Sequence, residues 1–170
     1  VRISNSSNFY TAPPNIYFYS QNSSVISWIK LNGCGSNPRL IDFGNGPSTD
    51  NIIIYFAPPC SPGTGIFDGT SVQVCVNGSF SLLTNQWYHI ATVYTGINVK
   101  LFINGNKITE TNGHSIQVKN KTISYIGKSN FEIDPSNLNN DFFFVFLKLT
   151  FIKLFLKVLN ADVDELRFYN

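Results

Sequence analysis

The chain has 170 residues, a formal net charge of +2 and 43% hydrophobic residues, including 15 Phe and 8 Tyr. This length and composition predict one folded domain with a substantial core and exclude an intrinsically disordered chain. Charged residues make up only 13%, against roughly 25% in typical soluble domains, so Asn and Ser must supply much of the polar surface. No cluster of Lys or Arg marks a nucleic-acid footprint, and we expect no nucleic-acid partner.

Several features of the chain are typical of an extracellular protein. It begins at Val1 and contains no Met, so we expect it to be part of a longer precursor. N-x-S/T sequons lie in polar or turn-like settings where a glycan is tolerated. We therefore predict a glycoprotein, secreted or the ectodomain of a membrane protein, with glycosylation sites at Asn5, Asn22, Asn77 and Asn120.

The three cysteines cannot all pair with one another. Either they form no disulfide framework, or a single bridge forms. For a bridge we favour Cys60 with Cys75, which leaves Cys34 unpaired or bonded outside the chain. Their spacings match no zinc or redox motif.

Short segments rich in β-branched and aromatic residues recur from residue 24 onward between Gly, Asn and Pro. The Asn77-Gly78 dipeptide predicts a tight hairpin after the segment SVQVCV, because both central residues of a type I′ turn need positive φ. The first predicted strands are 24–31, 39–43, 51–56 and 71–76.

The centre of the chain predicts a three-stranded meander over residues 87–109, in which WYHIATVY, VKLFI and KIT are joined by tight turns. In VKLFI, Val99, Leu101 and Ile103 share one face while Lys100 and Phe102 share the other. Residues 115–119 and 122–127 predict a further hairpin, and 161–169 a last strand. About ten short strands, with turns roughly every 8 to 12 residues, predict an all-β sandwich of two antiparallel sheets.

The order of these segments resembles a known family. The chain is similar to laminin-G-like, concanavalin A-like jelly-roll domains. The segments that carry the resemblance are, in order, SWIKLNG, RLIDFGNG, LLTNQWYHIATVYTGINVKLFINGNKI, ISYIGKSN and ADVDELRFYN, and they cover about residues 20–130 and 160–170. The resemblance implies a two-sheet jelly roll, usually one extracellular module of a larger protein, that binds carbohydrate or another protein without catalysis. The family's opening strand, with its F-D-G type motif, is not evident before Val25.

A Phe-rich run, FFFVFLKLTFIKLFLKVL, precedes the last predicted strand and holds six of the 15 Phe. The family has about a dozen residues at this place, so residues 138–159 are an atypical Phe- and Lys-rich insertion within the single domain 1–170. As a membrane span, its 14 apolar residues gain roughly 6 kcal/mol while its three lysines lose roughly 9 kcal/mol. We therefore expect no membrane span. Our hypothesis is an A/T-rich intron translated in frame.

Ligand binding is expected at the rim loops that join the strands. The polar candidates in these loops are Asn45, Asp50 and Asn130. Trp28 is a candidate for stacking on a sugar ring, although a Trp in a sandwich strand is more often buried in the core, and the same alternative holds for Trp87.

An enzyme is not expected. Retaining glucanases of similar fold carry an E-I-D-x-E strand, and Glu132 and Asp134 in FEIDPS match only its first half. Ser136 follows in place of the second Glu, so the acid that must protonate the leaving group is missing. His89 is expected to be a strand residue and not a base.

Calcium is the one cofactor that the sequence leaves open. Some jelly-roll members hold Ca²⁺ at a rim with Asp side chains and carbonyl oxygens, and the candidates here are Asp68, Asp162 and Asp164. Ordinary turn polarity is the alternative. The sequence as a whole predicts a recognition module for a glycan or an extracellular protein. The alternatives are a structural spacer without a ligand and, more distantly, a degenerate glycoside hydrolase-like sandwich.

Overall fold

The computed structural model describes residues 9–33, 38–69, 72–77, 79–112, 115–131 and 166–169, with residues 72–77 and Leu166 described by their backbone alone. Every regular element in these ranges is a β-strand. No helix within them is long and apolar enough to cross a membrane. The strands are β1 (Tyr10–Ala12), β2 (Asn22–Lys30), β3 (Arg39–Gly44), β4 (Ile52–Ala57), β5 (Ser61–Phe67), β6 (Val72–Asn77), β7 (Trp87–Thr95), β8 (Asn98–Ile103), β9 (Asn106–Asn112), β10 (Ile123–Ile126) and β11 (Leu166–Tyr169).

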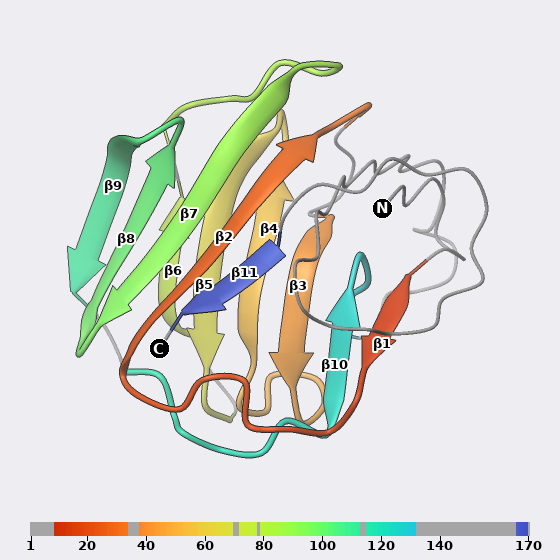
Figure 1. Cartoon of the computed structure of the whole chain (residues 1–170), viewed down its shortest axis with the longest axis vertical. Coiled ribbons are helices and arrows are strands. Elements are labelled where there is room, and N and C mark those ends of the chain that lie inside the picture. Colours follow the sequence, from red (N-terminus) through yellow and green to blue (C-terminus); the bar gives the residue numbers. More distant parts are fainter. Residues whose placement is uncertain are drawn as a thin grey trace.

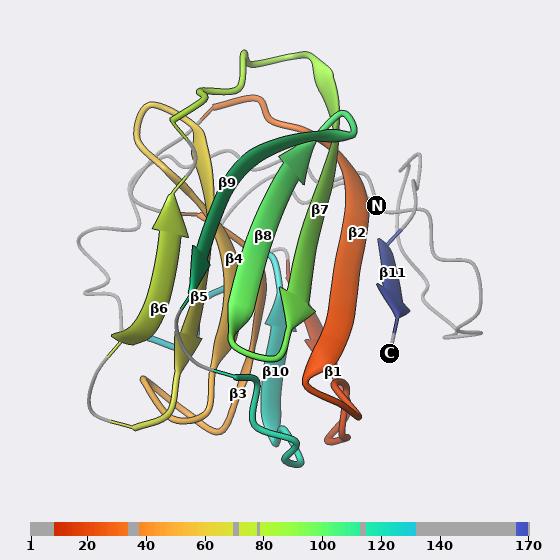
Figure 2. The same cartoon turned by 90° about the vertical axis from the view of Figure 1, so that its left-hand side faces the viewer.

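The strands form two antiparallel sheets that pack face to face (Figure 1). One sheet has six strands in the order β1-β10-β3-β4-β5-β6, and the other has five in the order β11-β2-β7-β8-β9. Figure 2 shows the two layers from the side, with β6 and β9 at the near edges. Packing removes one apolar face of each sheet from water. The predicted all-β, two-sheet antiparallel sandwich is confirmed.

Strand periodicity builds the core between the sheets. In β8, the alternate residues Val99, Leu101 and Ile103 are buried, and Lys100 and Phe102 lie on the opposite, outer face as predicted. The other core side chains come from both sheets and, for Phe18, from the loop before β2; they include Phe18, Val25, Ile29, Ile41, Phe43, Ile54, Phe56, Ile66, Ile90 and Tyr94.

The meander of β7, β8 and β9 is confirmed, but two predicted hairpins are wrong. After Asn77 the chain does not turn back, because β6 pairs with β5 and the following strand, β7, belongs to the other sheet. Residues 115–120 form no strand, and β10 pairs with β1 and β3. Ile116 still reaches the core with 1% exposure, whereas Val118 is 47% exposed, so the alternating apolar residues there are neither paired as a strand nor buried together.

The last strand belongs to the domain core. β11 pairs antiparallel with β2, with Phe168 opposite Val25. The Phe168 ring stacks on Phe43 of the other sheet with centroids 5.5 Å apart, and it also contacts Phe18 at 6.0 Å. The Phe-rich insertion, 138–159, lies outside the described residues, but the strand that follows it closes the sandwich.

Cys60, in the turn between β4 and β5, is disulfide-bonded. The predicted partner Cys75 lies on β6 opposite Gly65, five residues along the chain from Cys60. Five strand residues span about 16 Å, whereas disulfide-bonded Cα atoms lie about 4.4–6.8 Å apart. The predicted Cys60–Cys75 bridge is therefore incompatible with this register, and Cys34 lies outside the described residues.

Candidate binding surface on the five-stranded sheet

Trp28 lies within β2, two residues before its end, and 42% of it is exposed. Strand alternation explains this exposure, because Val25 and Ile29 point into the core and Trp28 therefore points outward. Its register partner on β7 is His89, and the two rings lie 5.2 Å apart at an angle of 59°. A Trp in a sandwich strand is usually buried in the core, but Trp28 is not. Its ring has the exposure that stacking on a sugar requires.

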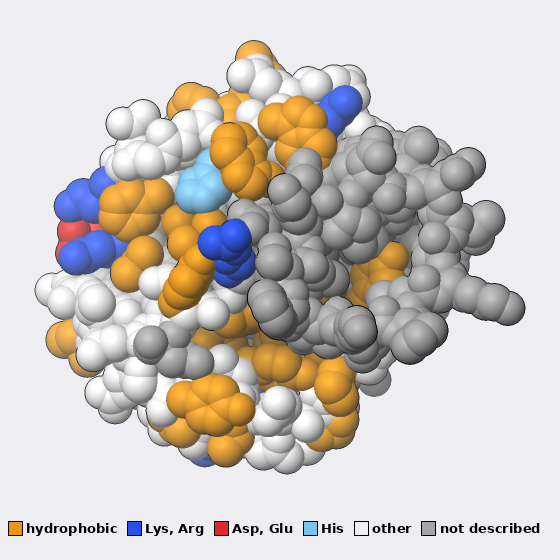
Figure 3. Space-filling model, in the orientation of Figure 1, with side chains coloured by type: hydrophobic (Ala, Val, Ile, Leu, Met, Phe, Trp, Pro, Cys, Tyr) orange, Lys and Arg blue, Asp and Glu red, His pale blue; other side chains and the backbone are white. Residues whose placement is uncertain are grey.

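Further rings continue this surface across the sheet. Trp87 is opposite Lys30 on β2, and Phe102 of β8 is opposite Ala91 of β7, two residues from His89 on the same face. We call Trp28, Trp87, His89 and Phe102 the aromatic platform. Figure 3, which faces the five-stranded sheet, shows hydrophobic side chains gathered around a histidine over β8, β7 and β2.

The turn between β8 and β9 holds one end of β7 in place beneath the platform. Asn104 Oδ1 accepts a hydrogen bond from His89 N at 2.9 Å, and Asn104 N donates to His89 O at 2.8 Å. Asn104 and Gly105 have φ values of 50° and 81°, which suits the Asn-Gly sequence of this tight turn. The backbone of His89 is therefore fixed to the neighbouring hairpin.

Charged side chains border the platform on the same face. Glu110 of β9 forms ion pairs with Lys107 at 2.6 Å and Lys100 at 3.6 Å. The hydrogen bond from Lys107 lowers the pKa of Glu110. Lys30 lies two residues beyond Trp28 on β2, and Arg167 of β11 is opposite Ile26. The centre of the face is thus apolar and its borders are polar.

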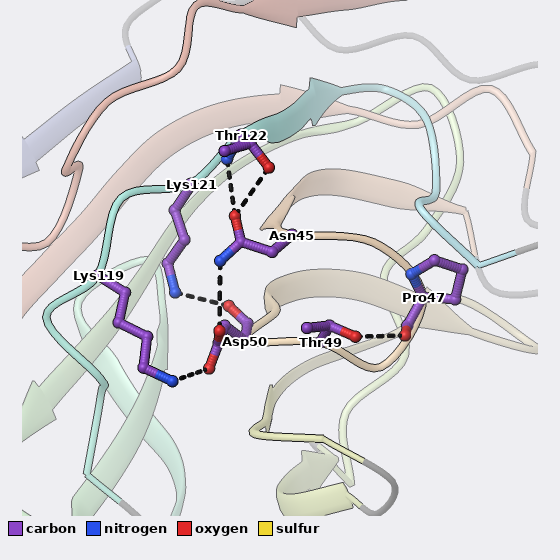
Figure 4. Close-up of polar contacts among 7 residues, drawn as sticks. All are labelled: Asn45, Pro47, Thr49, Asp50, Lys119, Lys121 and Thr122. Carbon is purple, nitrogen blue, oxygen red and sulfur yellow. Dashed lines mark hydrogen bonds and ion pairs between the residues drawn. The ribbon is translucent and has the colours of Figure 1, made fainter.

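The predicted ligand-binding residues Asn45 and Asp50 lie in the rim loop between β3 and β4 (Figure 4). Asn45 Nδ2 donates to Asp50 Oδ2 at 3.2 Å, and Asn45 Oδ1 accepts from the backbone N and the hydroxyl of Thr122, each at 2.9 Å. Lys119 Nζ donates to Asp50 Oδ1 at 2.7 Å. Burial alone would raise the pKa of Asp50, but the hydrogen bonds from Lys119 and Asn45 lower it overall. These contacts fasten the loop to residues 119–122.

Lys121 adds a further contact to this group of residues, Asn45, Asp50, Lys119, Lys121 and Thr122, which we call the rim joint. Lys121 is only 1% exposed, and its Nζ donates to the backbone carbonyl of Asp50 at 2.6 Å (Figure 4). Desolvation of the ammonium lowers its pKa to about 8, although the nearby Asp50 carboxylate favours the charged form. Lys121 therefore ties the β3–β4 loop to the segment before β10.

The predicted ligand-binding residue Asn130 lies on the six-stranded sheet, away from the platform. Its Nδ2 donates to Asp42 Oδ1 and to Ile123 O, and its backbone N donates to Asp42 Oδ2 at 2.8 Å. Asn51 Nδ2 donates to Asp42 Oδ1 at 2.8 Å. Burial raises the pKa of Asp42, and the bonds from Asn130 and Asn51 offset part of this rise. Asn130 thus anchors its own segment to β3.

The four predicted ligand-binding residues therefore do not converge. Trp28 lies on the outer face of the five-stranded sheet, Asn45 and Asp50 share the rim joint, and Asn130 lies on the other sheet. The sequence predicts a strand at His89 but not its position beside Trp28, which depends on the pairing of β2 with β7. The exposure of Trp28 has a local signal, because Trp28 shares its face of β2 with Lys30 and a Lys indicates the solvent face.

The predicted calcium site and the glycosylation sites stay predictions. Asp68 follows β5, and Asp162 and Asp164 lie outside the described residues. Among the residues that the structure describes, no group of three His, Cys, Asp or Glu side chains is placed to hold a metal. Asn22 and Asn120 are exposed, Asn77 ends β6, and Asn5 lies beyond the described ranges, as do Glu132, Asp134 and His114.

Comparison with known proteins places the chain in a family. A family profile described as the concanavalin A-like lectin/glucanases superfamily matches residues 4–146. The chain therefore belongs to this superfamily, and the resemblance seen in its motifs is confirmed. No curated protein sequence matches it.

Solved structures share the fold at low sequence identity. Mouse laminin α1 domains LG4-5 superpose with a TM-score of 0.62 at 12% identity, over 98% of this chain and 40% of that one. The CBM40 of Ruminococcus gnavus IT-sialidase, bound to α2,3-sialyllactose, gives 0.67 at 13% identity over 85% and 84%. Domain 4 of the Geobacillus stearothermophilus arabinanase AbnA, in complex with arabinotriose, gives 0.57 at 19% over 83% and 64%. The chain thus spans less than two thirds of the laminin and arabinanase structures.

Proposed function

We propose that this protein is a non-catalytic recognition module that binds carbohydrate through the aromatic platform. The observation that carries the proposal is the exposed Trp28 ring, which lies against His89 on the outer face of the five-stranded sheet. A pyranose ring presents a face of C–H groups, which pack on an aromatic ring while the hydroxyl groups reach polar neighbours. The apolar centre and polar border of this face suit such a ligand.

The family and its structural relatives support this proposal. Two of the solved structures with this fold were determined with an oligosaccharide, sialyllactose in one and arabinotriose in the other. The absence of a second Glu after Asp134 argues against glycoside hydrolysis, because the leaving group would have no acid. We also propose that the module acts outside the cell, as the sequons and the disulfide at Cys60 favour.

The rim joint favours the sheet face over the rim as the binding site. Asn45 and Asp50 already bond to each other and to residues 119–122, so a ligand would have to displace these contacts. Asn130 is likewise held by Asp42. These hydrogen bonds and ion pairs hold the β3–β4 loop against the segment before β10, which is a structural role.

A glycan array that includes glycosaminoglycans tests the proposal on the full chain. We expect the wild type to bind at least one glycan and Trp28→Ala to bind it at least ten-fold more weakly. Phe80→Ala is the matched control, because Phe80 is also 42% exposed but lies in the loop before β7. Near-UV circular dichroism confirms folding of both variants.

Two results would contradict the proposal. If the folded wild type binds no glycan, a protein-binding module or a structural spacer replaces it. If Trp28→Ala binds a glycan as well as the wild type does, the site lies elsewhere on the sandwich.

A further inference from the structure

The rings of the aromatic platform are arranged in a line that crosses the strands of the sheet. Trp28, His89 and Phe102 lie on three successive strands, β2, β7 and β8. The Trp28 and His89 rings are 5.2 Å apart. Phe102 is opposite Ala91, which makes it the diagonal neighbour of His89, at about 7–8 Å between Cα atoms. The three rings therefore form a row across the strands.

The spacing of this row matches a repeating ligand. Neighbouring strands lie about 4.8 Å apart, which is similar to the length that one pyranose residue adds to an extended chain. Trp28 and His89, directly opposite each other, are thus placed to contact successive sugar residues, while Phe102, about 7–8 Å from His89, lies within reach of a further residue of the same chain. A single sugar stacked on Trp28 would leave the Phe102 end of the row unused.

Exposed polar side chains of the described residues lie beyond both ends of the row. β2 is followed outward by β11, where Arg167 is exposed, and β8 by β9, where Lys107 is exposed. Long polar side chains at both ends can contact a chain that continues past the rings.

We infer that the platform binds an internal segment of a linear polysaccharide, with at least three sugar residues lying across β2, β7 and β8. This inference rests on the proposed function and adds the ligand's form and direction. Trp28 and His89 hold two successive sugars, and Phe102 extends the contact to a further residue. Contact with successive residues makes affinity depend on chain length.

Isothermal titration calorimetry with defined oligosaccharides tests the inference. The probes are di-, tetra- and hexasaccharides of β-1,4-glucan, arabinan and hyaluronan, so that neutral and acidic chains are compared. We expect at least one hexasaccharide to bind ten-fold or more tightly than its disaccharide. If only hyaluronan binds, Arg167 and Lys107 supply charge recognition; if a neutral chain binds equally well, the rings dominate. Either result supports an extended ligand when the hexasaccharide binds ten-fold or more tightly than the disaccharide.

Variants of the row separate its parts. We expect Phe102→Ala to weaken hexasaccharide binding at least five-fold and to change disaccharide binding less than two-fold, whereas Trp28→Ala weakens both. Phe102→Gln serves as a second variant if the alanine form loses near-UV ellipticity, and Phe80→Ala is the control. Equal affinity for di- and hexasaccharides, or an unchanged hexasaccharide affinity in a folded Phe102 variant, would overturn the inference while leaving sugar binding at Trp28 intact. If the folded wild type binds no saccharide of any kind, the proposed function falls as well.

Discussion

The carboxylate of Asp42 and the amide of Asn130, 88 residues apart in the chain, are joined by two contacts: Asn130 N donates to Oδ2 at 2.8 Å and Asn130 Nδ2 to Oδ1 at 3.0 Å. Asn51 Nδ2 and Ser129 Oγ also donate to this carboxylate, at 2.8 and 3.3 Å. Asp42 thus receives four donors on a side chain with 0% exposure. It fixes the segment after β10 to the outer side of β3.

Replacing Asp42 is therefore expected to destabilise the fold. In Asp42→Asn the new NH₂ group faces donors and leaves them unsatisfied, at a cost of about 2–3 kcal/mol. Urea unfolding followed by fluorescence measures the change. Ser129→Ala is the control, since it removes the longest of the four contacts, together with the bond from Phe131 N to Ser129 Oγ, and should cost about 1 kcal/mol. An Asp42→Asn variant as stable as the wild type would show that the network contributes nothing.

Lys121 predicts a rise of stability with pH. Its pKa falls from 10.5 in the unfolded chain to about 8 in the fold, so between these values the unfolded state binds more protons and the free energy of unfolding increases with pH. The gain attributable to Lys121 reaches up to about 3 kcal/mol by pH 10.5. It is absent below about pH 8, where both states are protonated.

The variant Lys121→Met isolates this effect. Thermal or urea unfolding at pH 7, 8, 9 and 10 gives the pH slope of each protein, and the difference between the slopes belongs to Lys121. We expect the variant to lack the extra rise above pH 8. Lys119→Met is the control, because Lys119 is half exposed and bonds to Asp50 at the surface. Parallel slopes for the wild type and Lys121→Met would refute the prediction.

Local pattern predicted most of the strands, and tertiary context decided the rest. The period-2 alternation of VKLFI placed Val99 and Leu101 in the core because side-chain parity depends only on the strand conformation. β5 was missed because SPGTGIF contains Pro and two Gly, and only its pairing with β4 and β6 makes it a strand. Conversely, 115–120 alternates without a partner and is not a strand.

In the candidate site, too, local sequence predicts some features and tertiary pairing decides the others. Sequence parity places Trp28 with Lys30 on one face of β2, so its exposure was predictable in principle. That His89 lies beside it depends on the β2–β7 register, which joins residues about 60 positions apart. The contact of Asn130 with Asp42 has no local signal at all.

The disulfide partner of Cys60 is predicted to be Cys34. The chain has three cysteines, and the β5–β6 register holds Cys75 too far along the strand. The two ends of the loop that carries Cys34, Leu31 and Pro38, also lie near Cys60. Pro38 O accepts a hydrogen bond from Phe56 N, on the strand before Cys60. Leu31 O accepts one from Asn85 N, and the nearby Leu82 N donates to Cys60 O. Peptide mapping without reductant should yield a Cys34–Cys60 peptide and an alkylatable Cys75. A Cys60–Cys75 peptide, or a disulfide-linked dimer, would contradict this assignment.

Deletion of residues 138–159 is expected to leave the domain folded. β11 pairs with β2 and its Phe168 packs on Phe43, so the strand after the insertion is required. The deletion keeps residues 132–137 and 160–165, and these twelve residues reach about 40 Å when extended, ample for a crossing between the two sheets. Near-UV circular dichroism during heating should show a cooperative transition for the shortened chain.

Deletion of residues 166–170 is the contrasting variant. We expect it to lower the free energy of unfolding by several kcal/mol, because the Phe168 contacts are lost. If only the chain that retains 138–159 melts cooperatively, the insertion is part of the fold and the intron hypothesis is wrong.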